Sequence, residues 1–535
     1  MPLPATPFWR SHSCLLAVLV LLGACQRPPT PSVATSNSGA ASVSIANPVL
    51  AGDFPDPSVT KVGDTYWATA TTSNWGPIFP LLKSRNLTDW ELAGHVFPAT
   101  PPAWADYYFW APEISQEGNK TYVFYTAHQR GGNLAVGVAS ANNPAGPYTD
   151  HGPLVGQPDG SIDGFPMRDE QGQLYLIWKE DGNSVNKPTP IWAQRLNDSR
   201  TALVGEKHEL FRNAPDTWEG NLVEGVSMVR HDGYFYAFYA ANGCCGAGCT
   251  YATGVARSRT LLGPWEKYAR NPILVNNDTW KCPGHGTVVE RQGRWYLLHH
   301  AYAATSQQFV GRQGVLSELT WTTTGWPEFR GGSTPVAEQA AAPQLRAVVE
   351  EFDGGVLSPV WQWPVEQRPS FVLRGGQFHL TARPDHVGAA LGVSTTAATY
   401  TATATLLQPA TIPASSRAGL AIHGDPDNAL LLVASGGKLQ LLQLEKGQHK
   451  TLAEAALPNA PAIQLRAQAQ QGSQFRFAWS TNGTTWQNMQ DGATIVSGTY
   501  LPPWDRGLRA GLVAQGPATI TAVFERFSLN SQPQQ

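Results

Sequence analysis

Charged residues are scarce in this sequence. Asp, Glu, Lys and Arg make up only 14% of its 535 residues, whereas about 25% is usual for a globular chain. Long charged helices and coiled coils are therefore excluded. The 37 basic and 40 acidic residues nearly cancel, leaving a net charge of −3. A nucleic-acid partner is not expected, because nothing in this balance provides the basic surface that such a partner needs.

The sequence also lacks long apolar runs, apart from one near its N-terminus. Arg10 and His12 precede an apolar stretch, residues 14–24, which is too short to span a bilayer and is typical of a signal peptide. Leu-Gly-Ala before Cys25 resembles the bacterial lipobox, in which the cysteine is lipidated after residues 1–24 are removed. The alternative is an ordinary signal peptide with a cysteine there by chance.

A tether is predicted after Cys25. Residues 25–46 are rich in Pro, Ser, Thr and Ala, a composition that favours disorder. We therefore expect an exported lipoprotein, anchored to a membrane of the bacterial cell envelope on its periplasmic or surface side.

Cysteine is rare, with six in the whole chain. Two fall in the signal region, which leaves four candidates for disulfide bonds in an oxidising compartment. Three pairings are possible in principle. A zinc site is the alternative, but the spacing matches no standard zinc motif. The four are Cys244, Cys245, Cys249 and Cys282.

Glycine, proline and aromatic residues, in contrast, are plentiful, and they accompany a repeat. Five segments share a glycine-containing turn followed by a tyrosine-centred apolar run, with the tyrosines 53 to 61 residues apart. Repeats of this length made of short strands indicate the blades of a β-propeller. We therefore predict an all-β chain with a five-bladed propeller over residues 47–336. The tyrosines are Tyr66, Tyr122, Tyr175, Tyr236 and Tyr296.

One ionisable residue precedes each of these tyrosines by 9–12 positions: Asp56, Glu113, Asp163, Glu224 and His285. The first strand of each propeller blade lines the central channel, so these five side chains are predicted to converge on one axis. They could instead be ordinary polar residues of turns. However, the carboxylates stand among apolar residues, and burying a carboxylate without a function is costly.

Several carboxylates near a pocket rimmed by Trp and Tyr suggest glycoside hydrolysis. That reaction needs one protonated acid for the leaving oxygen and one ionised carboxylate that activates water or attacks carbon. Neighbouring negative charges raise the pKa of one of the carboxyl groups, which keeps the acid protonated at neutral pH.

The motifs around these residues are similar to those of glycoside hydrolase family 43, the five-bladed propeller hydrolases of xylan and arabinan side chains. The resemblance covers roughly residues 47–336. Its motifs are the stretch from Asn47 to Ser58, Trp110-Ala-Pro-Glu113, Ser161-Ile-Asp163, Glu224-Gly225, Gly284-His285-Gly286 and Gly311-Arg312.

The resemblance implies roles for three carboxylates. Asp56 would be the general base that deprotonates water, and Glu224 the general acid. Asp163 would raise the pKa of the acid and orient it. The family inverts anomeric configuration, which implies carboxyl groups of Asp56 and Glu224 about 6.5–9.5 Å apart, with room for water between them.

Further residues are candidates for binding substrate. Arg312 resembles the arginine that reaches the innermost sugar, and His285 the channel histidine that in several members binds a central calcium; no other cofactor is expected. Glu113 could hold a substrate hydroxyl or Arg312, or it could be a structural acceptor. Trp110 and Trp75 are candidates for the pocket wall, although a propeller Trp is often part of the core.

A second domain is predicted after an Ala-, Gln- and Pro-rich linker, residues 337–349. Short alternating strands over residues 350–530 favour a β-sandwich. It resembles the concanavalin-like domain of many family 43 β-xylosidases and arabinofuranosidases, where it packs on the propeller and can close one side of the pocket. We expect packing and pocket shaping here, with independent sugar binding as the alternative. The loop of residues 242–251 is expected at the pocket rim, where disulfides would rigidify it.

These features favour an exo-acting enzyme that removes terminal α-L-arabinofuranosyl or β-D-xylosyl units from plant hemicellulose or pectin, and thus takes part in xylan and arabinan degradation. One alternative is an endo-arabinanase with calcium on the axis. Another, of a different class, is a surface lipoprotein that binds glycans without cleaving them. The presence of Asp56, Asp163 and Glu224 together argues against that second alternative, since a binder needs no acid and base.

Overall fold

The computed structural model describes residues 45–332, 347–492 and 494–532. The predicted signal peptide, Cys25 and most of the predicted tether and linker lie outside these residues. Within the described part of the chain, no helix combines the length and the apolar character needed to cross a membrane. Almost all regular structure there is β-strand; the helical elements are α1 (Gln307–Val310) and the 3₁₀ turns η1 (Gly182–Val185) and η2 (Pro409–Thr411).

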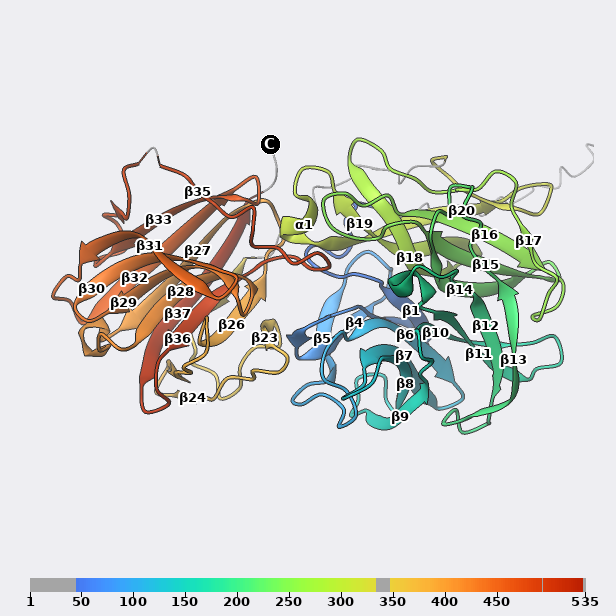
Figure 1. Cartoon of the computed structure of the whole chain (residues 1–535), viewed down its shortest axis with the longest axis horizontal. Coiled ribbons are helices and arrows are strands. Elements are labelled where there is room, and N and C mark those ends of the chain that lie inside the picture. Colours follow the sequence, from blue (N-terminus) through green and yellow to red (C-terminus); the bar gives the residue numbers. More distant parts are fainter. Residues whose placement is uncertain (1–44, 333–346, 493, 533–535) are drawn as a thin grey trace, which may run out of the picture. The chain divides into compact units, whose positions relative to one another are not determined.

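Five four-stranded antiparallel sheets follow one another along the chain and form the blades of a propeller (Figure 1). Their strands are β1 (Ser58–Val62), β2 (Thr65–Thr69), β4 (Ile78–Ser84) and β5 (Glu91–Phe97); β6 (Trp110–Glu117), β7 (Lys120–His128), β8 (Leu134–Ala141) and β9 (Thr149–Val155); β10 (Ser161–Arg168), β11 (Leu174–Glu180), β12 (Ile191–Leu196) and β13 (Leu203–Phe211); β14 (Val223–His231), β15 (Tyr234–Ala241), β16 (Ala252–Ser258) and β17 (Glu266–Lys267); β18 (Trp280–Arg291), β19 (Arg294–Ala303), β20 (Arg312–Trp321) and β21 (Pro327–Phe329). The predicted five-bladed propeller is confirmed.

The repeated glycine lies in the hairpin between the first and second strands of each blade. All five of these glycines have a positive φ, from 55° at Gly118 to 84° at Gly172. Glycine adopts this conformation at little cost because it has no Cβ. The tyrosine that follows is buried on the second strand in every blade, so the repeat combines a turn signal with a core position.

The chain segment before the first blade closes the ring. The side chain of Asn47 donates to the backbone oxygen of Leu316 on β20 at 3.0 Å and accepts from its backbone nitrogen at 2.9 Å. Leu50 forms a bridge to Gly314 on the same strand. The segment of residues 47–50 is thereby fixed next to the last blade.

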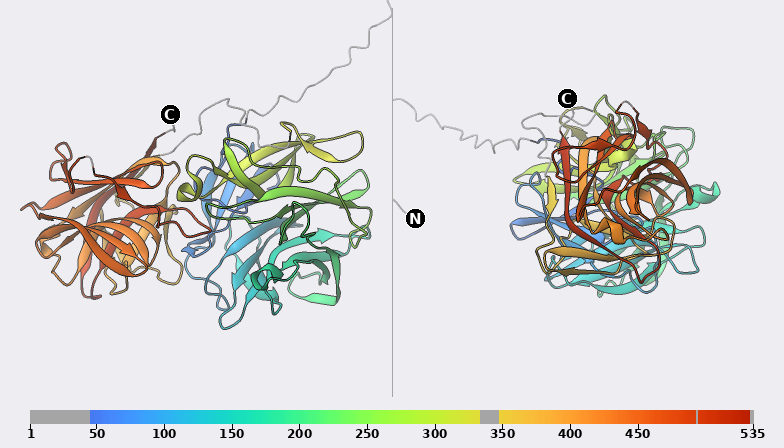
Figure 2. Two further views of the ribbon diagram at one scale, coloured as in Figure 1. Left: turned by 45° about the horizontal axis from the view of Figure 1, so that its top comes forward. Right: turned by 90° about the vertical axis from the view of Figure 1, so that its left-hand side faces the viewer.

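The C-terminal region is a β-sandwich of two large sheets, drawn in orange and red in Figures 1 and 2. One sheet is built from β22 (Val348–Glu350), β24 (Phe371–Arg374), β25 (Gln377–Thr381), β27 (Thr399–Leu407), β32 (Ala462–Gln470), β33 (Gln474–Ser480), β34 (Gln487–Asn488), β35 (Val496–Ser497) and β37 (Thr521–Gln532). The other contains β3 (Trp75–Gly76), β23 (Trp361–Pro364), β26 (Ala389–Ser394), β28 (Arg417–Asp425), β29 (Asn428–Ser435), β30 (Lys438–Glu445), β31 (Gln448–Ala456) and β36 (Arg509–Gln515).

The core of the sandwich follows the simple alternation of a half-buried strand. On β27, Tyr400, Ala402, Ala404 and Leu406 are buried, because successive side chains of a strand point to opposite faces. These residues belong to one large apolar cluster that fills the space between the sheets. The predicted sandwich is confirmed.

The sandwich is joined to the propeller by direct contacts, and two of them involve the first blade and the segment before it. Strand β3, which belongs to the chain segment of the first blade, pairs with β23 of the sandwich. In addition, Asp53 accepts a hydrogen bond from the guanidinium of Arg509 on β36 at 2.8 Å, and both side chains are buried. The motif that contains Asp56 therefore also carries a residue that fastens the second domain.

Candidate active site

A local irregularity recurs at the innermost strand of every blade. Asp56, Ala111, Asp163, Gly225 and His285 all have a positive φ, and in the last four blades the register shifts at this place. Such bulges often re-aim side chains near active sites. They also show that the five ionisable residues do not occupy equivalent positions on their strands. Glu224 lies one position before the irregularity, and Glu113 lies two positions after it.

Asp56 lies in a dense set of hydrogen-bond donors. Its Oδ2 accepts from the hydroxyl of Thr71 at 2.7 Å, and its Oδ1 accepts from Arg312 at 2.9 Å. The Nδ1 atoms of His300 and His285 lie 3.1 and 3.5 Å from the same Oδ1. Burial by itself would raise the pKa of Asp56, but Arg312 and the two histidines hold it well below its usual range. Asp56 is therefore an ionised carboxylate, as a base must be.

Glu224 is held by two donors from neighbouring strands. Lys179 on β11 donates to Oε2 at 2.6 Å, and the hydroxyl of Tyr251 donates to Oε1 at 2.8 Å. Burial would raise the pKa of Glu224, but the ammonium of Lys179 and the Tyr251 hydroxyl lower it. In the substrate-free site these contacts favour the ionised form of Glu224.

Asp163 is bonded to the backbone of the residue that follows Glu224. Its Oδ2 accepts from the backbone nitrogen of Gly225 at 2.8 Å and lies 4.0 Å from Nδ1 of His285. A Cβ at Gly225 would lie 2.7 Å from the ring of His285, so the Glu224-Gly225 motif needs its glycine for this close approach. Burial raises the pKa of Asp163 to about 6, and the charge of Glu224 acts in the same direction.

In the substrate-free protein the surroundings act on the two carboxyl groups in opposite directions, because they raise the pKa of Asp163 and lower that of Glu224. Lys179, a buried cation that the sequence analysis did not consider, lowers the pKa of Glu224. The two coupled groups titrate as a pair, and the expected role of Asp163, keeping the acid protonated, stays a prediction.

Glu113 does not contact Arg312. Its Oε2 accepts from the hydroxyl of Thr287 at 2.9 Å, and burial raises the pKa of Glu113 to about 8. Thr287 lies two residues beyond His285, just as Glu113 lies two beyond Ala111. Since residues two apart share a face of a strand, this pair belongs to the next layer of the channel, which favours the structural alternative for Glu113.

No group of three or more His, Cys, Asp or Glu side chains suitable for a metal ion occurs among the described residues. His285 is the predicted calcium ligand, and its Nδ1 is directed to the carboxylates of Asp56 and Asp163. A calcium ion held by His285, directly or through water, stays a prediction, and no chemical step here is assigned to a metal.

Arg312 also contacts the sandwich. One guanidinium nitrogen donates to the backbone oxygen of Asp505 at 3.2 Å. Its Nε is buried and finds no acceptor among the described residues. Arg312 thus lies between the predicted base and the sandwich loop that contains Asp505.

The same loop reaches Trp110. Trp110 donates from Nε1 to the hydroxyl of Ser73 at 3.1 Å, and Ser73 in turn donates to Asp505. The ring of Trp504 meets Trp110 edge-on, with ring centroids 6.0 Å apart. Trp504 is 52% exposed. Trp110 and Trp504 therefore lie together at the loop that contacts Arg312, and a role of Trp110 in the pocket wall stays a prediction.

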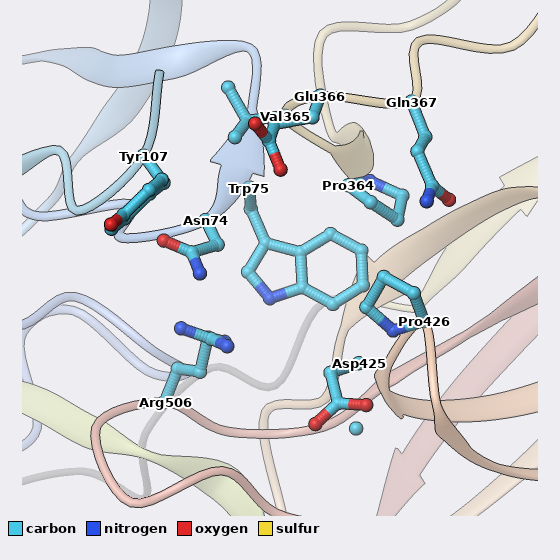
Figure 3. A pocket seen from close by; sticks show the side chains of 11 residues that line it. Asn74, Trp75, Tyr107, Pro364, Val365, Glu366, Gln367, Asp425, Pro426 and Arg506 are labelled. Atoms are coloured by element: carbon cyan, nitrogen blue, oxygen red, sulfur yellow. The ribbon is translucent and has the colours of Figure 1, made fainter. Parts of the chain in front are cut away.

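Trp75 has a different position. It is buried on β3, with Arg509 over its ring at 5.0 Å. Figure 3 shows its indole at the centre of a separate pocket, with Arg506 on one side and Pro364 on the other. Trp75 thus packs between the domains, and its expected role in the pocket wall stays a prediction.

The four cysteines form two disulfides, Cys244–Cys245 and Cys249–Cys282. The backbone nitrogen of Gly246 in this loop donates to the hydroxyl of Tyr302 at 3.3 Å. Tyr302 pairs with Arg312 across β19 and β20. The loop thus lies against the strands that carry the site, in agreement with a position at its rim.

Several residues of the site escaped the sequence analysis, namely Thr71, Lys179, Tyr251, His300 and Asp505. For Lys179 a signal exists, because a charged residue ends the apolar run Leu174–Trp178. For the others no sequence signal exists, because similar threonine, tyrosine, histidine and loop residues occur at many places in the chain. Only the fold shows that they lie next to Asp56, Glu224 or Arg312.

Comparison with known families agrees with this site. The model described as "Glycosyl hydrolases family 43" matches residues 45–327, and that described as "Beta xylosidase C-terminal Concanavalin A-like domain" matches residues 349–530. The propeller with its axial carboxylates and the sandwich therefore define a glycoside hydrolase. Within that class, the chain belongs to glycosyl hydrolases family 43.

Individual relatives are more distant. A xylan 1,3-beta-xylosidase of Vibrio sp is 28% identical over 63% of this chain and 70% of its own length. A non-reducing end alpha-L-arabinofuranosidase of Bacteroides ovatus is 26% identical over 70% of this chain and 72% of its own. Among solved structures, a xylan beta-1,4-xylosidase from Bacillus halodurans has a TM-score of 0.77 and covers 91% of this chain and 100% of its own at 22% identity. That likeness establishes the shared fold.

Proposed function

We propose that the protein is an inverting exo-glycosidase that removes terminal α-L-arabinofuranosyl or β-D-xylosyl units from plant cell-wall oligosaccharides or polysaccharides. The observation that carries this proposal is the meeting of Asp56, Asp163 and Glu224 around His285. Relatives named for both sugars support the substrate class.

In the proposed reaction, a water molecule gives a proton to Asp56 while its oxygen bonds to the anomeric carbon. The bond from that carbon to the glycosidic oxygen breaks, and Glu224 supplies the proton that the leaving oxygen takes up. Attack and departure on opposite faces of the ring invert the anomeric configuration. Arg312 keeps Asp56 ionised.

The sandwich loop supports exo rather than endo action. Asp505 contacts Arg312 through its backbone oxygen, and Trp504 meets Trp110. These contacts put the sandwich loop beside Arg312, the residue that we propose reaches the innermost sugar. A long polysaccharide lying across the site would have to pass this loop, whereas a chain end would not.

The proposal is tested by assaying p-nitrophenyl α-L-arabinofuranoside and β-D-xyloside beside arabino- and xylo-oligosaccharides. We expect Asp56→Asn to lose activity on all of them, by about 10²–10⁴-fold. Glu224→Gln should lose activity on oligosaccharides but retain much of it on the aryl glycosides, because nitrophenolate leaves without protonation. Proton NMR of the first product should show the inverted anomer.

Asp385→Asn is the control, because this carboxylate is exposed on the sandwich. The acid and base roles fail if both site variants keep wild-type activity on oligosaccharides. Activity confined to polymeric arabinan and lost in EDTA would instead favour a calcium-dependent endo-arabinanase. Tight glycan binding with no hydrolysis by the wild-type protein would favour a binding lipoprotein.

We further propose that the enzyme is exported and anchored by a lipid on Cys25. The support is the apolar run of residues 14–24 followed by the lipobox-like pattern. Mass spectrometry of the mature N-terminus should find a diacylated cysteine, and Cys25→Ala should move the protein from the membrane fraction to the soluble fraction. A mature N-terminus elsewhere, without lipid, would contradict this proposal.

A further inference from the structure

Lys179 is a buried cation in the candidate active site that no motif assigns. Its side chain is only 1% exposed, on strand β11. A buried ammonium is costly unless it is paired. Lys179 is paired twice, with Glu224 Oε2 at 2.6 Å and with Asp181 Oδ1 at 2.8 Å. Burial would lower its pKa, but the carboxylates of Glu224 and Asp181 hold it above its ordinary value, so the ammonium stays charged.

The contact with Lys179 distinguishes the two oxygens of Glu224. An ammonium has three donors and no acceptor, so its charge disfavours a proton on Oε2, the oxygen to which Lys179 donates. A proton on Glu224 is therefore favoured on Oε1. That oxygen now accepts from Tyr251, whose hydroxyl can rotate and accept in turn.

Four other groups contribute to the charge around Glu224. Asp163 on β10 adds negative charge, and His285 on β18 lowers the pKa of Glu224. Tyr251 keeps its proton, because burial raises the pKa of its hydroxyl well above the ordinary value. Asp181, after β11, lies on the far side of Lys179. Lys179 is thus the only lysine or arginine bonded to Glu224 among the described residues.

We propose that Lys179 is the positioning residue of the general acid: it fixes Oε2 of Glu224, directs the catalytic proton to Oε1, and limits the pH range in which that proton is present. This inference rests on the proposed function, since it concerns the same acid. The glycosidic oxygen would take the place of the Tyr251 hydroxyl at Oε1 and receive the proton there.

The sign of the expected pH effect follows from the charge. An ammonium favours the ionised carboxylate, so it moves the loss of the acid form to lower pH. Lys179→Met removes the charge and keeps a side chain of similar length. The alkaline limb of kcat/KM on an oligosaccharide should then move upward by about 1–3 pH units, the usual effect of one close opposite charge. Tyr251→Phe should move it in the same direction by less.

Two variants serve as matched controls. Lys179→Arg keeps the charge, so the alkaline limb should stay near its wild-type position even if kcat falls. Asp181→Asn removes the second partner of Lys179 and a nearby negative charge, so the limb should move to lower pH. A purely structural role of Lys179 would lower activity in the Met and Arg variants alike and leave the limb in place.

The experiment measures kcat/KM against pH on a xylo- or arabino-oligosaccharide and on the matching p-nitrophenyl glycoside. A Lys179→Met protein that is active on the aryl glycoside but has an unshifted limb on the oligosaccharide overturns the inference. If that variant does not fold, Asp181→Asn decides: a downward shift supports the inference, and an unchanged or upward limb overturns it. A wild-type protein inactive on every glycoside would instead overturn the proposed function.

Discussion

The innermost strands of the propeller and the interior of the sandwich bury different kinds of side chain. The sandwich buries an apolar cluster, to which β27 contributes alternate residues. At the propeller axis, Asp56, Asp163, Glu224 and Lys179 are buried instead. Each of these charges has a partner at hydrogen-bond distance, because a buried charge without one is unstable.

This difference separates stability from chemistry within one chain. Apolar burial is non-directional and roughly proportional to area, so many sequences can fill the sandwich. The propeller axis depends instead on particular donors at particular atoms, such as Thr71 on Oδ2 of Asp56 and Tyr251 on Oε1 of Glu224. Replacing one donor there should change the pKa of the carboxylate that accepts from it more than it changes the fold.

The two regions meet at a buried ion pair, where we expect the largest effect on stability. Asp53→Ala leaves the guanidinium of Arg509 buried without its carboxylate, which should cost about 3–5 kcal/mol of the free energy of unfolding. Activity should fall as well, since the loop before β36 would lose its attachment. Urea unfolding measures the first effect. Asp385→Ala, in an exposed pair with Arg383, is the control and should change stability by less than about 1 kcal/mol; an equal effect of both variants would refute the prediction.

A substitution inside the sandwich core should affect stability alone. Leu432 on β29 is fully buried, and Leu432→Ala should destabilise the protein by about 2–5 kcal/mol through lost apolar contacts and a cavity. At a temperature where the variant is folded, its kcat/KM should match the wild type. Leu262, which is 38% exposed, provides the control Leu262→Ala, expected within about 0.5 kcal/mol of wild type. A folded Leu432→Ala protein with low activity would break the separation of the two regions.

Trp504 tests how far the sandwich takes part in substrate binding. Trp504→Ala removes an aromatic contact with Trp110, and such contacts are worth about 0.5–1.5 kcal/mol. We therefore expect KM for oligosaccharides to rise about 2- to 10-fold, with a smaller change in kcat. Trp486→Ala, a half-buried tryptophan elsewhere on the sandwich, should leave KM unchanged. A rise in both variants would indicate a general loss of packing.

At Glu113 we expect a change in the pH dependence of stability. Its pKa is about 8 in the folded protein and ordinarily 4.5. A raised carboxyl pKa contributes stability that is fully present below about pH 4.5 and is lost as the pH rises through 8. The free energy of unfolding of Glu113→Gln should therefore rise relative to that of the wild type as the pH increases from 5 to 9, because the amide does not ionise. Urea unfolding at pH 5, 7 and 9 checks this, and a constant difference would contradict it.

Much of the fold could be predicted because local sequence patterns indicate it. The glycine turns and buried tyrosines mark the five blades, and alternating residues such as those of β27 mark the sandwich. The convergence of Asp56, Asp163, Glu224 and His285 also followed from the repeat, since equivalent positions of successive blades meet at the axis. Glu113 shows the limit, because a shift of two residues at a β-bulge places it in another layer.

The repeat, the second domain and the residues able to act as acid and base could be predicted from the sequence alone. The folded chain was needed to show which cysteines pair, that Trp75 packs between the domains, and that Asp53 is bonded to Arg509. It was also needed to show which charges act on Glu224. The physical reason is that a pKa depends on charges within a few ångströms, and Lys179 is 45 residues from Glu224 in the sequence but 2.6 Å away in space.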